Sequence, residues 1–244
     1  MTEMKVIAVI PARLASTRLP RKMLRQIAGK TLLARVYEGV RSSPLLHDVI
    51  VATDSEEIMQ LCRQHGWNAR LTLATHRSGT ERVREISDLA EADIYLNVQG
   101  DEPLTRAEHI AALSDLMRDP QVQVGTLKTP ASGEDINNPN AVKVVTDSVG
   151  RALYFSRAKI PFDRDGSRPS YFKHLGYYAY RKPALDRFCT LPESSLEISE
   201  RLEQLRFLEN GIPIQVGETP YDTVGVDTEG DLRRVEAILK QRET

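Results

Sequence analysis

Cationic side chains gather in one short stretch directly after the first apolar run of the chain. Arg13, Arg18 and Lys22 follow the strand-like run Met4–Ile10, which Pro11 is expected to end. Ligands of open α/β sheets bind beyond the carboxyl ends of the strands, and several cations there can together neutralise a polyphosphate. The stretch lacks the glycine patterns of a P-loop or a dinucleotide-binding turn. It therefore predicts a different kind of triphosphate site, with ordinary solvated loop cations as the alternative interpretation.

Two aspartates could provide the metal ion that a triphosphate needs. Asp101 closely follows the strand-like run Ile94–Val98, and Asp227 stands just before a predicted helix. Magnesium usually takes one or two carboxylates together with substrate phosphates and water. The pair predicts a Mg²⁺ site, although either residue could instead be a turn residue or a helix cap. Asp54 also ends a strand, but Ser55 beside it favours helix capping over metal binding.

Further polar residues stand among apolar neighbours and must be hydrogen-bonded to each other or to a ligand. They are Asn97, Gln99, Arg157, His174, Tyr178, Glu203 and Gln204. The competing interpretation for His174 is a structural histidine. For Glu203 and Gln204 it is an ordinary position on a helix surface.

Composition excludes several function classes. The chain has 244 residues, within the range of one large α/β domain, and 33 basic against 34 acidic residues, so no global field attracts nucleic acid or an anionic membrane. Cys62 and Cys189 are the two cysteines, without a metal-binding spacing, which favours a reducing compartment. No stretch resembles a signal peptide or a membrane span. We expect a cytoplasmic protein with no nucleic-acid or membrane partner.

Alternating strand and helix patterns must position these residues. In the first half, alternation predicts βαβ units and a mostly parallel sheet flanked by helices. The predicted strands are 47–53, 94–98 and 122–128, and the predicted helices are 32–42, 55–65, 81–89 and 106–118. Ser78, Gly79 and Thr80 precede the third of these helices and offer free backbone donors at its start.

The second half is richer in strand patterns. Residues 141–146 and 151–155 predict a hairpin, residues 157–171 a mobile loop and residues 171–180 an aromatic strand. Helices are predicted at 196–209 and 229–241, with capping boxes formed by Ser194 with Glu197 and by Thr228 with Asp231. We expect a single domain over 1–244 with a β-rich lobe within about 141–195.

Nine sequence blocks carry a resemblance to one family and together span nearly the whole chain. They are IPARLASTRLPRKML, VATD, HRSGTER, NVQGDEP, NPNAVKVV, ALYFSRAKIPFDRD, KHLGYYAYR, LEQLR and GVDTEGDL. In sequence and order they resemble the 3-deoxy-manno-octulosonate (Kdo) cytidylyltransferases. The resemblance implies a Rossmann-like nucleotidyltransferase fold with a β-rich dimerisation lobe, a homodimer, and transfer of CMP from CTP to an eight-carbon acidic sugar for lipopolysaccharide assembly, with Mg²⁺ as cofactor.

The resemblance also assigns site residues by position. Arg18, Lys22, Asp101 and Asp227 would carry the catalysis, the two aspartates as metal ligands. The nucleotide would be bound by Ala12, Arg13, Arg18, Lys22, Ser78, Gly79 and Gln99. The sugar would be bound by Gln99, Arg157, His174, Tyr178, Glu203 and Gln204. Two alternatives stay open. The first is the same reaction on the 8-amino analogue of Kdo or on another acidic sugar, and the second is a non-catalytic nucleotide-binding dimer.

One position departs from the family pattern. Members commonly carry Gly-Lys-Pro after the Leu-Pro of the first block, whereas this chain has Arg21-Lys22-Met23 after Pro20. If the backbone there needs a positive φ, arginine costs roughly 1 to 2 kcal/mol and shifts the loop. The placement of Lys22 depends on that conformation.

Overall fold

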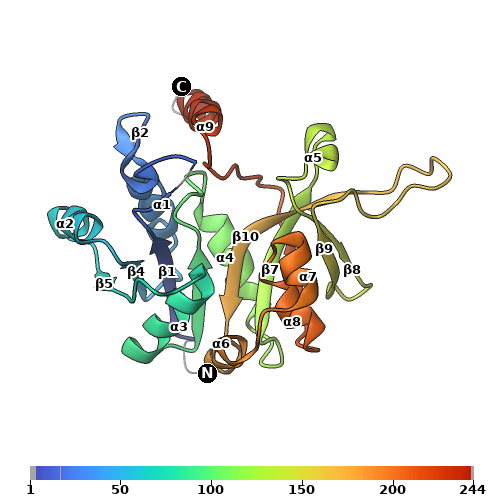
Figure 1. Cartoon of the computed structure of the whole chain (residues 1–244), viewed down its shortest axis with the longest axis horizontal. Coiled ribbons are helices and arrows are strands. Elements are labelled where there is room, and N and C mark those ends of the chain that lie inside the picture. The colour runs from blue at the N-terminus through green and yellow to red at the C-terminus, as the bar shows by residue number, and fades with distance from the viewer. Residues whose placement is uncertain (1–3, 17, 243–244) are drawn as a thin grey trace. The chain divides into compact units, whose positions relative to one another are not determined.

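The computed structural model describes residues 4–16 and 18–242. The chain forms two compact units, the first made of residues 1–111 and 223–244 and the second of residues 112–222 (Figure 1). The predicted lobe at 141–195 falls inside the second unit. The single domain expected over 1–244 stays a prediction.

A parallel sheet forms the centre of the first unit. Its strands lie in the order β6 (Ile94–Val98), β1 (Val6–Ala12), β4 (Asp48–Thr53) and β5 (Ala69–Leu71). This confirms the predicted α/β fold with a mostly parallel sheet. The expectation that Pro11 ends the first strand is wrong, since Pro11 pairs in register with Ala52. Proline removes one ladder donor but keeps its carbonyl, and its φ suits an extended backbone.

Three helices of the first unit pack against this sheet: α1 (Leu32–Arg41), α2 (Glu56–His65) and α3 (Gly79–Leu89). The N-cap of α2 is Ser55, whose hydroxyl accepts from the Ile58 N–H. The capping role expected for Asp54 is therefore wrong, because this carboxylate instead pairs with the fully buried Arg82 at 2.5 Å. A buried guanidinium needs a compensating charge.

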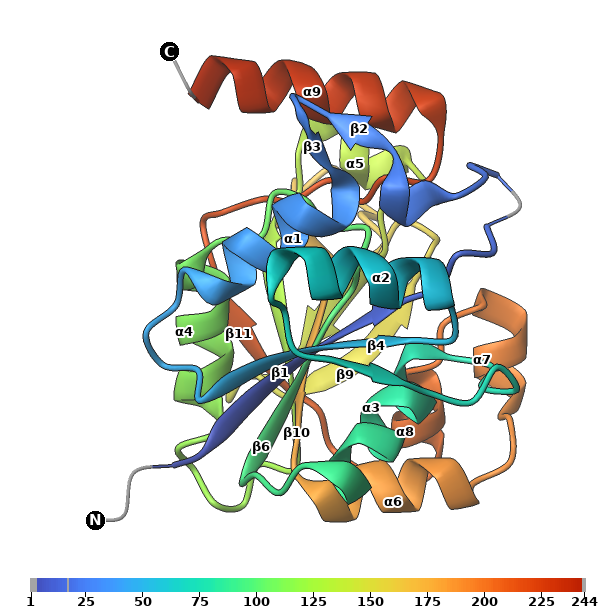
Figure 2. The same ribbon diagram turned by 90° about the vertical axis from the view of Figure 1, so that its left-hand side faces the viewer.

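The C-terminal helix α9 (Glu229–Arg242) packs on a small hairpin of the first unit (Figure 2). The hairpin pairs β2 (Gln26–Ile27) with β3 (Lys30–Thr31) and follows a 3₁₀ turn, η1 (Lys22–Leu24). The apolar cluster between them includes Leu19, Ile27, Leu32, Leu104, Val226, Leu232, Val235 and Leu239. The predicted capping box at the start of α9 is confirmed, since Thr228 and Asp231 exchange hydrogen bonds. This packing ties the end of the chain to the loop after β1.

Antiparallel pairing dominates the second unit. Strand β7 (Val124–Pro130) pairs antiparallel with β10 (Phe172–Tyr180) and parallel with β11 (Gln215–Glu218). Strands β8 (Lys143–Thr146) and β9 (Ala152–Ser156) form the predicted hairpin, and β8 also pairs with β10. The second unit also contains helices α5 (Gly133–Asn137) and α6 (Lys182–Thr190). Helix α4 (Ala107–Leu116) crosses the boundary between the two units, which lies between residues 111 and 112.

The single helix predicted at 196–209 is wrong. The chain forms α7 (Ser195–Glu200) and α8 (Leu205–Glu209), and Arg201 between them has a left-handed φ of 55°. The capping box of Ser194 with Glu197 is confirmed. The Arg157 guanidinium donates to the carbonyls of Glu200 and Arg201 and so satisfies acceptors that a continuing helix would have used.

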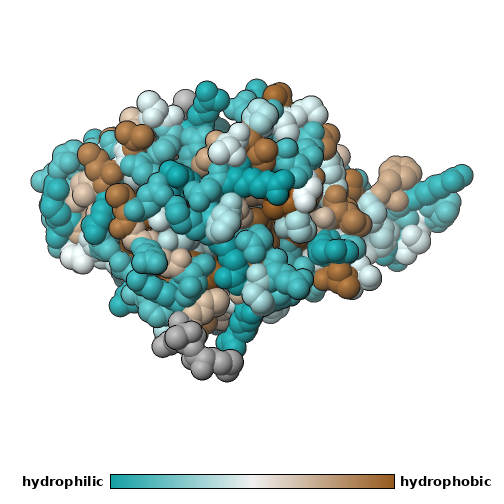
Figure 3. Space-filling view, turned by 90° about the horizontal axis from the view of Figure 1, so that it is seen from below, coloured by the Kyte–Doolittle hydropathy of each residue, from teal (hydrophilic) through white to brown (hydrophobic). Residues whose placement is uncertain are grey.

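Residues 157–171 contain no helix or strand and extend from β9 as a long loop (Figure 1). The loop is largely hydrophilic in the space-filling view (Figure 3). It also contains Phe162, which is 84% exposed. Among the described helices, none has the length and apolar character needed to cross a bilayer.

Candidate nucleotide and metal site

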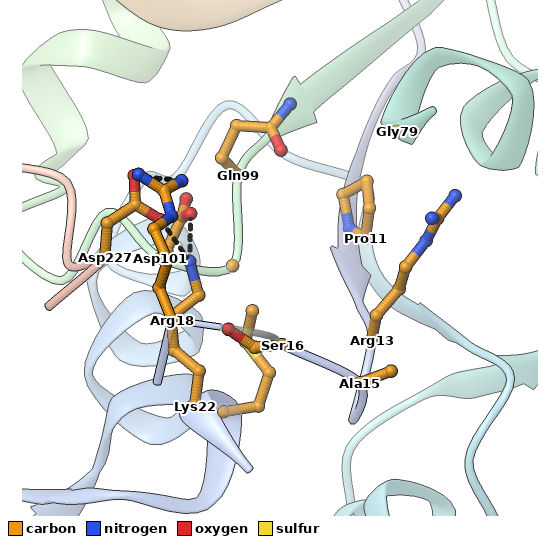
Figure 4. Close-up of a pocket in the computed structure, with 12 residues that line it drawn as sticks. Pro11, Arg13, Ala15, Ser16, Arg18, Lys22, Gly79, Gln99, Asp101 and Asp227 are labelled. Carbon is orange, nitrogen blue, oxygen red and sulfur yellow. Dashed lines mark hydrogen bonds and ion pairs between the residues drawn. The ribbon is translucent and has the colours of Figure 1, made fainter. Parts of the chain in front are cut away.

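A pocket of about 330 Å³ lies in the first unit and is built from distant parts of the sequence (Figure 4). It is lined by Pro11, Arg13, Ala15, Ser16, Arg18, Lys22, Met23, Gly79, Gln99, Gly100, Asp101 and Asp227. All three cations predicted from the first loop and both predicted carboxylates are among them. These five residues therefore line one pocket, as their predicted roles require.

The ammonium group of Lys22 lies between the two carboxylates. Its Nζ donates to Asp101 Oδ2 at 2.7 Å and to Asp227 Oδ1 at 3.0 Å, and Arg18 pairs with the other oxygen of Asp227 at 3.0 Å. The Lys22 side chain is only 9% exposed. Burial alone would lower the Lys22 pKa, but the two aspartates together raise it above its usual value. The site thus holds two anions and two cations in contact.

Backbone contacts bring the two aspartates together. The N–H of Val226 donates to the Asp101 carbonyl at 2.9 Å, which joins the segment before α9 to the turn after β6. A Cβ at Gly100 would lie 2.8 Å from the Pro11 carbonyl oxygen and 3.0 Å from the Met23 sulfur. Glycine therefore allows the turn that bears Asp101 to approach the loop that bears Lys22.

Arg13 lies on the other side of the pocket, near Pro11 and Gly79 (Figure 4). Its Nη2 donates to the main-chain carbonyl of His76. Gln99 donates from Nε2 to Asn97 Oδ1 at 3.3 Å, and a Cβ on Gly79 would lie 3.2 Å from that Nε2. The N-terminus of α3 thus stands against Gln99. The three predicted cations are divided between two sides of the pocket.

Two predicted nucleotide residues do not line the pocket. Ala12 is fully buried as the last residue of β1. Ser78 is the N-cap of α3, and its hydroxyl accepts from the Glu81 N–H at 3.3 Å. Ala15, Ser16, Met23 and Gly100 do line the pocket without having been predicted, because small or apolar loop residues carry no chemical signal in a sequence.

The other predicted sugar residues lie in the second unit. The rings of His174 and Tyr178 are 5.4 Å apart. His174 Nε2 is 2.9 Å from Thr126 Oγ1, which itself donates to the Tyr177 carbonyl at 2.7 Å. The Thr126 hydroxyl hydrogen is thereby used, so we assign the proton of the imidazole to Nε2 and a lone pair to Nδ1. Burial lowers the pKa of His174 to about 3, so its ring is neutral near pH 7.

The remaining predicted sugar residues differ in burial and in hydrogen-bond partners. Burial raises the pKa of Tyr178 well above its usual value, with additional effects of Tyr180 and Glu203, so the phenol keeps its proton. Gln204 is buried at the start of α8, and Glu203 precedes it. Arg157 donates from Nε to the Glu200 carbonyl at 2.7 Å and from Nη1 to the Pro139 carbonyl at 3.0 Å. Main-chain acceptors therefore fix the guanidinium.

Asp101 and Asp227 fit a divalent metal ion. Both carboxylates already contact one cation, the Lys22 ammonium, so they can share a positive charge at that point. Among the described residues, no group of three or more histidines, cysteines and acidic residues could form a complete protein cage for a metal. Magnesium prefers a donor set of one or two carboxylates, with phosphates and water in its remaining coordination positions.

Comparisons with known proteins identify the relatives of this chain. The family profile described as Cytidylyltransferase matches residues 7–215. The 3-deoxy-manno-octulosonate cytidylyltransferase of Koribacter versatilis is 69% identical over 98% of this chain and 91% of its own length. That of Acidobacterium capsulatum is 56% identical over 99% of both chains.

Solved structures agree with these relatives. A CMP:2-keto-3-deoxy-manno-octonic acid synthetase complexed with CTP has a TM-score of 0.93 at 42% identity and covers 98% of this chain and 99% of that one. A cytidylyltransferase from Leptospira borgpetersenii has a TM-score of 0.64 at 16% identity and covers 98% of this chain and 87% of that one, which shows a shared fold only.

Proposed function

Because this chain belongs to the family of 3-deoxy-manno-octulosonate cytidylyltransferases, we propose that its pocket between Arg13 and Asp227 binds CTP and a divalent metal ion. The enzyme activates Kdo with CTP and releases pyrophosphate. The other product, CMP-Kdo, is used for lipopolysaccharide assembly. The observation that carries the site assignment is the contact of Asp101 and Asp227 with the single ammonium of Lys22.

The reaction joins two anions, so charge neutralisation and positioning are its main requirements. The anomeric hydroxyl oxygen of the sugar attacks the α-phosphorus of CTP, the bond from that phosphorus to the bridging oxygen breaks, pyrophosphate leaves with this oxygen, and the hydroxyl proton passes to water. Lys22 and Arg18, which pair with Asp227, would exchange this partner for phosphate oxygens and stabilise the charge that develops on pyrophosphate. Arg13 and the N-terminus of α3 would bind the opposite side of the nucleotide.

A family of cytidylyltransferases suggests a divalent metal, and we propose Mg²⁺ held by Asp101 and Asp227. When bound, it would polarise the α-phosphate and make the attacking hydroxyl more acidic. The carboxylates would then exchange the Lys22 ammonium for the metal, which leaves Lys22 to the phosphates.

We propose that the second unit recognises the sugar. Arg157 would counter its carboxylate, because main-chain carbonyls already fix the guanidinium. His174 and Tyr178 are neutral and can read hydroxyls, His174 as an acceptor at Nδ1 and Tyr178 as a donor. Glu203 and Gln204, which belong to the same unit, would complete this set.

We further propose a cytoplasmic homodimer that associates through the second unit. In the described part of the chain, Cys62 is buried, Cys189 is exposed and no disulfide joins them, as in proteins of a reducing compartment. Exposed apolar residues of the second unit, such as Leu153 and Ile198, would supply the contact.

The experiment that tests the site measures pyrophosphate release from CTP and Kdo by Asp101→Asn and Asp227→Asn variants. We expect turnover to fall by roughly two to three orders of magnitude, because each change removes a charge at the reacting phosphate. Asp115→Asn is the matched control, since Asp115 is an exposed aspartate paired only with Arg118 among the contacts that the structure describes. Near-normal turnover in a folded Asp101→Asn variant would overturn the metal assignment.

A further inference from the structure

Residues 72–78 connect β5 to α3 and contact the pocket through Arg13. The guanidinium of Arg13 donates to the main-chain carbonyl of His76, near the middle of this connection. The position of that carbonyl therefore determines where one edge of the guanidinium is held.

Two glutamates of α3 hold the connection through its backbone. Glu85 Oε2 accepts from the Leu73 N–H at 3.1 Å, and Glu81 Oε2 accepts from the Arg77 N–H at 2.7 Å. Glu81 and Glu85 are one helical turn apart and face the same segment. They restrain the chain on both sides of His76.

The His76 side chain lies between the same two carboxylates. Its Nε2 is hydrogen-bonded to Glu85 Oε2, and its Nδ1 lies 3.6 Å from Glu81 Oε2. The ring is only 15% exposed, so it is held largely out of solvent. The start of the connection is fixed independently, because the buried Arg82 donates to Thr72 Oγ1 and pairs with Asp54.

We propose that His76 is a positioning residue for CTP binding, which it serves by fixing Arg13. The imidazole anchors its own backbone to α3, and the carbonyl of that backbone orients the guanidinium of Arg13, which lines the pocket. This inference rests on the proposed role of Arg13 toward CTP. It assigns His76 no contact with substrate.

A KM-against-kcat comparison tests this role. In the His76→Ala variant, we expect KM for CTP to rise roughly ten- to a hundredfold, while kcat and KM for the sugar change less than about twofold, because a binding group is misplaced rather than removed from the reaction. His76→Gln keeps a side-chain donor toward Glu85 and should recover most of the loss. His65→Ala is the control, since His65 stacks on Trp67 at the end of α2.

A double-mutant cycle separates positioning from general stability. If His76 acts through Arg13, Arg13→Ala combined with His76→Ala should bind CTP as weakly as Arg13→Ala alone. The inference would be overturned if the two substitutions raised KM for CTP by independent factors that multiply in the double variant. An unchanged KM for CTP in His76→Ala would overturn it as well. Should His76→Ala fail to fold, Glu85→Gln weakens the same anchor and must show the same coupling to Arg13.

Failure of the proposed function is a distinct result. If Arg13→Ala leaves the KM for CTP unchanged, the assignment of Arg13 to the nucleotide is wrong. If Arg13→Ala weakens CTP binding and His76→Ala does not, only the inference about His76 is wrong.

Discussion

At the scale of single residues, the ammonium of Lys22 occupies the point where the carboxylates of Asp101 and Asp227 would share a metal. Two carboxylates at such a short separation repel one another unless a cation lies between them. Lys22 thus neutralises the two carboxylates that we propose as metal ligands.

Replacing Lys22 should separate its two roles. In Lys22→Gln we expect turnover to fall by roughly two to three orders of magnitude, because the leaving pyrophosphate loses a charge partner. Binding of Mn²⁺ alone, followed by electron paramagnetic resonance without nucleotide, should become tighter because the competing cation is gone. Lys30→Gln, an exposed lysine paired with Glu38, is the control. Weaker or unchanged Mn²⁺ binding would contradict this competition.

Arg21 has the left-handed backbone conformation on which the expected cost of its departure from the family pattern depends. It has a φ of 55° and a ψ of 34°, and its side chain pairs with Glu57 of α2. Relief of the left-handed conformation in Arg21→Gly should contribute about 1 to 2 kcal/mol, against up to ~1 kcal/mol for the exposed ion pair. We therefore expect the free energy of unfolding in urea to rise. Arg21→Ala keeps the strain and loses the pair, so it should be destabilised.

His174 makes stability depend on pH. Its pKa is about 3 in the folded protein and about 6.5 in an unfolded chain, so the unfolded state binds more protons between these values. The stabilisation is complete above about pH 6.5 and is lost as pH falls toward 3. Between pH 7 and pH 5, urea titrations should show about 2 kcal/mol less stability from this residue. A His174→Gln variant with the same pH slope as the parent would contradict this assignment.

At the scale of elements, α9 determines where Asp227 lies. Asp227 directly precedes the capping box of α9, whose buried residues Leu232 and Val235 pack on the hairpin. Leu232→Ala should lower stability by about 2 to 5 kcal/mol. Turnover should fall as well, because a loosened α9 misplaces Asp227. Amide hydrogen exchange would locate the loosening in α9 and β2–β3, and Arg233→Ala on the exposed side is the control. Full turnover despite faster exchange in α9 would contradict this link.

Local patterns predicted some elements well and others poorly. The strand at Ile94–Val98 was predicted at its observed bounds, since an apolar run between polar residues needs no distant information. The break at Arg201 could not be predicted, because residues 196–209 all permit a helix and the capping donor is Arg157, more than forty residues earlier. Asp54 was misassigned for the same reason, since its partner Arg82 comes from another helix.

At the scale of the whole molecule, the sequence indicated which residues gather but not how they are paired. Lys22 and Asp101 follow predicted strands and Asp227 precedes a predicted helix, and all three line one pocket as expected. The same pattern could not show that Arg13 contacts a carbonyl of His76, because main-chain partners carry no signature in the sequence. The division into two units at residues 111 and 222 also depends on contacts between distant segments.

Association of two copies is the remaining prediction at this scale. Leu153 on β9 and Ile198 on α7 are 61% and 53% exposed, and exposed apolar side chains in one unit favour a protein contact there. Light scattering after size exclusion should give a dimer for the parent and a monomer for Leu153→Asp combined with Ile198→Asp, because a buried interface does not tolerate unpaired charges. Leu71→Asp and Leu73→Asp change equally exposed leucines of the first unit and should leave the dimer intact. If the dimer persists in the Leu153→Asp, Ile198→Asp variant but dissociates in the Leu71→Asp, Leu73→Asp variant, the interface lies in the first unit instead.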